Sequence, residues 1–274
     1  SNIGESHYVF VNAHALFGLF GFASLLIMGV AFQVIPMFYV AQDFPKPFQS
    51  KAPLAVFALL FIGFIFMYLN FDIFVVKTAF TVIFLVFAYL GLKSLNNRKR
   101  PVFDVTLWYW KLSLSMLAIS MLIFLAGAMS SNYVLAILFA FGFLYSLLQG
   151  MVYKIIPFLA WFHLTSKGYF TVPTLREFID EKYIKYNFYL HVASIVLFVL
   201  AYYINPLIYL AATLFILSNI LFLISSFIPP PLSLILITAC FSSSTNDMNT
   251  KAFSSDLLFS NMASFALFEI FSKA

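Results

Sequence analysis

The stretch that decides the fold is Gly29-Val-Ala-Phe-Gln-Val-Ile-Pro36, which recurs 121 residues later as Gly150-Met-Val-Tyr-Lys-Ile-Ile-Pro157. The match extends backwards without gaps, because Phe20-Gly21-Phe22 aligns with Phe141-Gly142-Phe143. Each copy closes a long apolar run. A match at a fixed spacing predicts an internal duplication, and the apolar runs predict helices that span a membrane.

The composition points to a chain that has lipid as its solvent. Hydrophobic residues make up 63% of its 274 residues and charged residues only 9%, whereas about a quarter of the residues of a soluble domain are charged. The net charge of +5 does not indicate nucleic acid, because the basic residues lie in short loops between apolar segments. The single Cys240 excludes an intrachain disulfide and makes no metal site by itself.

Seven apolar runs are long enough to predict spanning helices. The second is short, and the first and fifth are longer than a membrane requires. The runs are Tyr8–Val40, Leu54–Leu69, Ile73–Leu92, Val105–Met129, Tyr133–Trp161, Phe188–Ile204 and Leu207–Ile228.

The loop charges alternate along the chain and predict its orientation. Loops one, three and five hold almost all the basic loop residues, and the even loops hold nearly none. The positive-inside rule then places the odd loops in the cytoplasm and the N-terminus outside the cell inner membrane. The odd-loop residues are Lys46, Lys51, Lys93, Arg98, Lys99, Arg100, Lys167, Arg176, Lys182 and Lys185.

The duplicated helices lie four spans apart and run in the same direction, so the predicted repeat is parallel. The predicted fold class is an all-α polytopic membrane bundle of about seven helices. We divide it into a first four-helix unit (1–131), a second, partial unit (132–231) and a poorly defined tail (232–274). The chain shows no cleavable signal peptide and begins without an initiator Met, so further helices are expected before Ser1.

The repeated motif permits two interpretations. A proline inside a membrane helix frees the carbonyl four residues earlier, and a freed carbonyl needs a partner. The motif is therefore either a kinked cofactor or ion pocket, or a packing kink whose glycines let neighbouring helices approach. We expect Lys154 to extend its ammonium to the interface, and Asp104 to be solvated. The motif residues are Gly29, Gln33, Pro36, Gly150, Lys154 and Pro157.

The histidines are the strongest candidates for chemistry, because imidazole is a common axial ligand of haem iron. His14 lies inside the first apolar run, where an unpaired imidazole is costly. His7 is two turns earlier on the same face. We expect His163 and His191 near the cytoplasmic face at one depth, either as ligands or, more simply, as interfacial residues. Any metal would be bound only through haem iron.

The stretch His14-Ala-Leu-Phe-Gly-Leu-Phe-Gly-Phe22, continued by Gly29-Val-Ala-Phe-Gln-Val-Ile35, resembles the second helix of haem–copper oxidase subunit I. It is most similar to the cbb3-type and nitric-oxide-reductase branch and to NnrS-like membrane proteins. The resemblance implies stacked four-helix units, one helix missing before Ser1, and His14 as an axial ligand of a low-spin haem. In that family the second haem ligand lies eight helices after the first, beyond the end of this sequence, so the partner of His14 is expected outside this chain or is unidentified. The position equivalent to His14 in the second copy is Leu135.

Three functions follow as hypotheses. The first is a haem-binding membrane protein related to respiratory oxidases or nitric-oxide-handling proteins. If it is an enzyme, it is a component of a membrane oxidoreductase. The second is a transporter or channel without a cofactor, with Gln33, Gln149, Lys154 and the two prolines along its path. The third is a structural subunit that packs on other membrane subunits. All three have the lipid bilayer as a partner and none binds nucleic acid.

Overall fold

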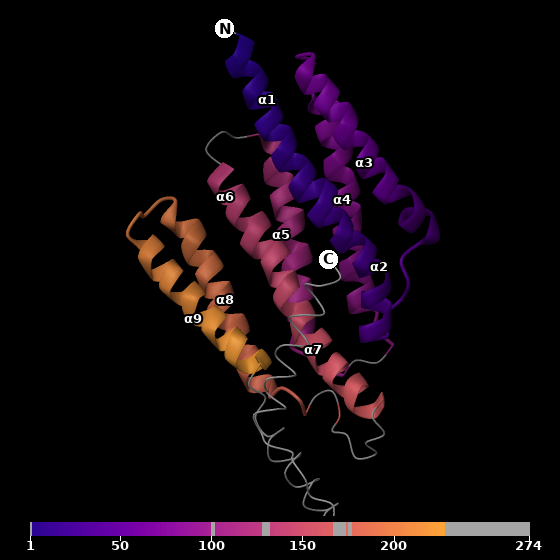
Figure 1. Ribbon diagram of the computed structural model, residues 1–274, viewed down its shortest axis with the longest axis vertical. Helices are drawn as coiled ribbons and strands as arrows, with labels where there is room; N and C mark the ends of the chain where they lie inside the picture. Colours follow the sequence, from indigo (N-terminus) through magenta and orange to yellow (C-terminus); the bar gives the residue numbers. More distant parts are fainter. Residues whose placement is uncertain (1, 100–101, 128–131, 167–173, 175–176, 228–274) are drawn as a thin grey trace, which may run out of the picture.

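The structure is a computed structural model that describes residues 2–99, 102–127, 132–166, 174 and 177–227. It confirms an all-α membrane bundle, because seven of its helices are long and apolar enough to cross a membrane and the described residues form no strand (Figure 1). The predicted tail, 232–274, lies outside the described residues, so its assignment stays a prediction.

The first and fifth spans have the same composite build. In the first, α1 (Asn2–Leu16), the π-helical segment η1 (Phe17–Ser24) and α2 (Leu25–Tyr39) follow one another without a break. In the fifth, α6 (Asn132–Ile137), η3 (Leu138–Tyr145) and α7 (Ser146–Ser166) do the same. The two π-helical segments begin 121 residues apart, which is the spacing of the sequence motif. A duplication would produce this agreement, but the duplication itself stays a prediction.

The other five spans are single helices, and two of them begin earlier than their apolar runs. The helix α3 begins at Lys46 because Pro45 and Pro47 favour a helix start there. The helix α8 begins at Glu181, where the Asp180 side chain accepts a hydrogen bond from the Lys182 amide at 2.9 Å. The five helices are α3 (Lys46–Tyr68), α4 (Phe74–Asn96), α5 (Thr106–Ala126), α8 (Glu181–Ala201) and α9 (Leu207–Phe227).

The helix α5 joins the two halves of the bundle. It packs against α4 on one side and against η3 and α7 on the other, whereas α8 and α9 pair with each other beside the fifth span (Figure 1). A β-carbon added at Gly91 of α4 would lie 2.7 Å from a methyl group of Leu114 in α5. The glycine therefore lets α4 and α5 approach closely around a core that includes Phe84, Phe87 and Trp110.

The outer surface of the bundle is apolar on most sides. Large side chains such as Leu54, Val75 and Tyr209 are more than two-thirds exposed, and no span has more than 44% of its apolar window buried within the chain. A soluble protein rarely exposes so much contiguous apolar surface. The protein is therefore an integral membrane protein whose outer helix faces contact lipid.

Candidate functional site

The predicted ligand His14 lies on the uncovered face of the first span. Both His14 and His7 are exposed, and the exposed stripe continues through Gly18 and Phe22. Among the described residues, no hydrogen bond or ion pair involves the His14 imidazole. A β-carbon added at Gly18, one turn after His14, would meet nothing within 4 Å. The face thus combines a free imidazole with open space beside the helix backbone.

The two other candidate histidines do not meet, so their predicted common depth is wrong. His163 is exposed in the last turn of α7. His191 is fully buried at the centre of α8, where its Nε2 is 2.8 Å from the hydroxyl of Ser146. Ser146 and His163 lie on the same helix about 25 Å apart. The error came from placing the start of α8 at Phe188, because the polar turns from Glu181 are also helical.

His191 sits in an aromatic setting that leaves no room for a macrocycle. The rings of Tyr145, Tyr109 and Phe215 lie 5.6 to 6.4 Å from the imidazole. Its Nδ1 is buried and has no hydrogen-bond partner among the described residues. The residues around His191 therefore do not fit a haem, and the predicted role of His191 as a cofactor ligand has no geometric support.

A buried polar network, centred on Asn187, lies one helical turn from His191 and was not predicted from the sequence. The Asn187 side-chain amide donates to the hydroxyls of Tyr109 and Tyr153, at 3.0 Å each. Its carbonyl oxygen accepts from Ser218 at 2.6 Å, and Tyr153 also pairs with Ser225 at 2.9 Å. The network connects α5, α7, α8 and α9. The available signal was the four-residue spacing of Asn187 and His191, which places two polar side chains on one helix face.

The two motif glycines behave differently. A β-carbon added at Gly150 would lie 2.7 Å from the Tyr109 β-carbon and 3.5 Å from the Thr106 carbonyl oxygen, so Gly150 permits close packing of α5 and α7. A β-carbon added at Gly29 would meet nothing within 4 Å, because that residue is exposed. The packing interpretation of the motif therefore fits the surroundings of Gly150 and does not fit those of Gly29.

The remaining motif residues of the second copy face the protein interior. Pro157 is buried inside α7, whereas its counterpart Pro36 is half-buried inside α2. Gln149, next to the motif glycine, is fully buried, and neither atom of its amide group has a hydrogen-bond partner among the described residues. A buried, unpaired amide is unfavourable in a membrane protein and is commonly satisfied by water or a polar ligand.

Lys154 and Asp104 form an ion pair, so the expectation that Asp104 is solvated is wrong. The side chains are 25% and 15% exposed, respectively. Asp104 also accepts hydrogen bonds from the amide and the hydroxyl of Thr106 at 2.9 and 2.7 Å. The Thr106 hydroxyl pairs with that of Tyr39 at 2.8 Å, and the Lys154 ammonium lies 5.5 Å from the Tyr39 ring centroid. This network connects the last residue of α2 and the first turn of α5 with the middle of α7.

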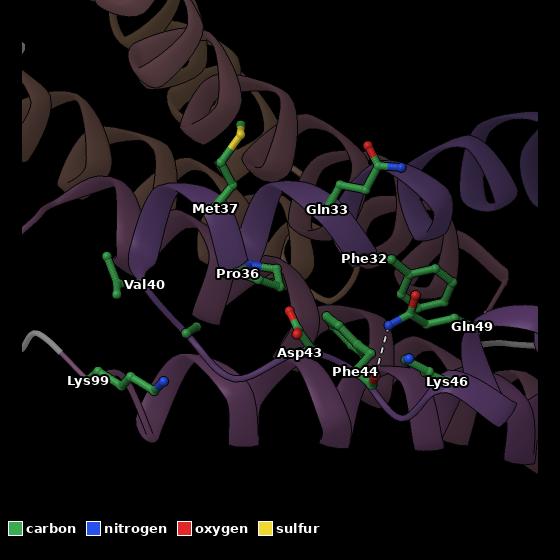
Figure 2. Close-up of a pocket in the computed structure, with 11 residues that line it drawn as sticks. Phe32, Gln33, Pro36, Met37, Val40, Asp43, Phe44, Lys46, Gln49 and Lys99 are labelled. Carbon is green, nitrogen blue, oxygen red and sulfur yellow. Dashed lines mark hydrogen bonds between the residues drawn. The ribbon is translucent and has the colours of Figure 1, made fainter.

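A pocket of about 580 Å³ lies at the turn between α2 and α3. Figure 2 shows the side chains of its lining, with Asp43 between Lys99 on one side and Lys46 on the other. Gln33 belongs to this lining, but Gln149 and Lys154 do not. The motif polar residues therefore do not share this pocket. The remaining lining residues are Phe32, Pro36, Met37, Val40, Ala41, Phe44 and Gln49.

Comparison with known proteins does not identify the chain. It matches no protein-family model, no curated protein and no solved structure. Among the described residues, no group of three His, Cys, Asp or Glu side chains is placed to hold a metal ion. The site assignments therefore rest on the sequence and on the geometry above.

Proposed function

We propose that this integral membrane protein binds haem on the exposed face of its first span, with His14 as an axial ligand. The observation that carries the proposal is the uncovered His14 imidazole next to the open space at Gly18. An imidazole that faces lipid without a partner is unfavourable, so a group that both covers it and binds its nitrogen is expected there. The resemblance to haem–copper oxidase subunit I points to the same residue.

Within this proposal the chain supplies one ligand and a flat surface. His14 would hold the iron, and the open space at Gly18 would leave room for the ring beside the helix. A bound haem would supply electron transfer or gas binding. Neither His163 nor His191 lies on this face, so neither would be a second ligand of the same iron.

The test is a reduced-minus-oxidised absorption spectrum with a pyridine haemochrome assay on the detergent-purified chain. We expect a Soret band in the wild type and in His7→Ala, which removes an exposed histidine from the same face. His14→Ala should remove the band while leaving the helical circular dichroism unchanged. A band that survives in His14→Ala, or folded wild-type protein that takes up no haem, would contradict the assignment.

A second candidate, a transporter or channel without cofactor, is favoured by one observation. Gln149 is buried in the second half of the bundle, and neither atom of its amide group has a hydrogen-bond partner in the part of the chain that the structure describes. Water entering from a path would satisfy that amide. If so, a cysteine at position 149 in a Cys240→Ser background should react with a small water-soluble thiol reagent. Complete protection from the reagent would count against a path.

We also infer that the protein lies in the cell inner membrane with the N-terminus outside. The support is the concentration of basic residues in the odd loops. In whole cells carrying Cys240→Ser, a membrane-impermeant maleimide should label Asn70→Cys in an even loop. It should not label Asn97→Cys in an odd loop until the cells are opened. The reverse pattern would refute the orientation.

A further inference from the structure

We propose that the pocket between α2 and α3 binds the headgroup of phosphatidylethanolamine. The proposal is independent of haem binding. It rests on the charges of the pocket, on its apolar rim and on its position at the ends of two spanning helices.

The pocket carries both signs of charge in a separated arrangement. Lys46 and Lys99 line it together with Asp43, and all three residues are exposed. Within the described part of the chain, the only ion pair is between Lys154 and Asp104, so neither pocket lysine pairs with Asp43. When opposite charges line one cavity but form no ion pair, they offer separate binding sites for an anion and a cation.

The shape of the pocket follows from the turn that ends α2. Val40 adopts a left-handed conformation with φ 50°, and the chain then turns towards Pro45 before α3 begins. Phe32 and Phe44 are buried and supply an apolar wall, with their ring centroids 5.1 Å apart. Met37 also belongs to the lining and is 61% exposed. A ligand in this pocket would therefore contact polar groups and an apolar surface at once.

The location selects a lipid over a water-soluble ligand. The pocket lies where one spanning helix ends and the next begins, which is the depth of lipid headgroups. Met37 and Val40 line the pocket and are exposed apolar side chains, so they would contact acyl chains. The headgroup of phosphatidylethanolamine has a phosphate for Lys46 and Lys99 and a primary ammonium for Asp43. Phosphatidylglycerol lacks the ammonium, and the quaternary ammonium of phosphatidylcholine has no N–H to donate.

The test is a native mass spectrometry titration of the delipidated 274-residue chain with three lipids of identical acyl chains. We expect phosphatidylethanolamine to bind about fivefold more tightly than phosphatidylcholine or phosphatidylglycerol, as one added ionic hydrogen bond of this kind would give. Asp43→Asn should abolish this preference, and Asp43→Glu should retain it. Equal binding of the three lipids, tighter binding of phosphatidylglycerol, or an unchanged preference in Asp43→Asn would overturn the proposal.

Two further arms separate the headgroup contacts from general effects. The double variant Lys46→Gln with Lys99→Gln should weaken all three lipids, whereas Lys51→Gln, an exposed lysine of α3 outside the pocket, should weaken none. Equal losses in the double variant and the control would refute the assignment of the phosphate site. Glycerophosphoethanolamine, which has no acyl chains, should compete only weakly. Competition as strong as that of the lipid would identify a soluble phosphodiester as the ligand instead.

Discussion

Alanine at the two equivalent motif glycines should have opposite effects on stability. At Gly150 the new β-carbon would lie 2.7 Å from the Tyr109 β-carbon. That atom is attached directly to the α5 backbone, and the Tyr109 hydroxyl is held by Asn187, so the side chain cannot move aside easily. Overpacking of this kind costs about 1–3 kcal/mol. The higher helix propensity of alanine returns up to about 1 kcal/mol.

Gly150→Ala should therefore lower the free energy of unfolding by about 1–2 kcal/mol. Gly29→Ala adds a β-carbon that meets nothing within 4 Å. It should be neutral or raise the free energy of unfolding by about 0.5–1 kcal/mol, because only the helix propensity changes. Each variant adds one methyl group at the same position of the repeated motif, so each is the control for the other.

The assay is reversible unfolding in mixed micelles, with the dodecyl sulfate mole fraction as denaturant and circular dichroism as the signal. Gly150→Ala should have the lower midpoint, and Gly29→Ala should match or exceed the wild type. Equal midpoints for the two variants, or a more stable Gly150→Ala, would refute the conclusion that Gly150 is a site of close packing between α5 and α7.

Three further predictions concern other features of the bundle and use the same assay. Asn187→Leu removes three hydrogen bonds and should lower the free energy of unfolding by about 2 kcal/mol, since such bonds average about 0.6 kcal/mol in membrane proteins. An unchanged free energy of unfolding would show that the network adds no stability. A double-mutant cycle of Lys154→Gln and Asp104→Asn should give a coupling energy of about 1 kcal/mol, and zero coupling would refute the ion pair. Val40→Gly should raise the free energy of unfolding by about 1 kcal/mol, because a β-branched residue is strained in the left-handed conformation. Asn70→Gly should change the free energy of unfolding little, because asparagine tolerates that conformation. Equal effects of the two variants would contradict the strain at Val40.

Much of the fold could be predicted because membrane helices are set by runs of apolar residues. All seven spans were predicted, and the predicted start of the last one, Leu207, is the observed start of α9. The errors lie at helix starts that are polar. The apolar runs begin several residues after Lys46 and Glu181, so hydropathy alone places these helix starts too late. Pro45 and Asp180 favour helix starts at Lys46 and Glu181, and the helices therefore extend into the headgroup region.

The site was harder to predict because it depends on which helix faces meet. The sequence places His191 on α8, but only the packing shows that the imidazole is buried against Ser146. The pairing of Lys154 with Asp104 joins two spans, and no local pattern announces it. The two copies of the motif also look alike in sequence, yet one glycine packs against α5 and the other faces outward.

The measurement that tests the proposed function most directly is imidazole rescue of His14→Gly. This variant removes the side chain of the proposed ligand and leaves a space beside Gly18 that free imidazole can enter. Purified His14→Gly should take up haem only when imidazole is added, and the His7→Gly control should take it up without imidazole. An imidazole-independent haem spectrum in His14→Gly, or no difference between the two variants, would contradict His14 as the ligand.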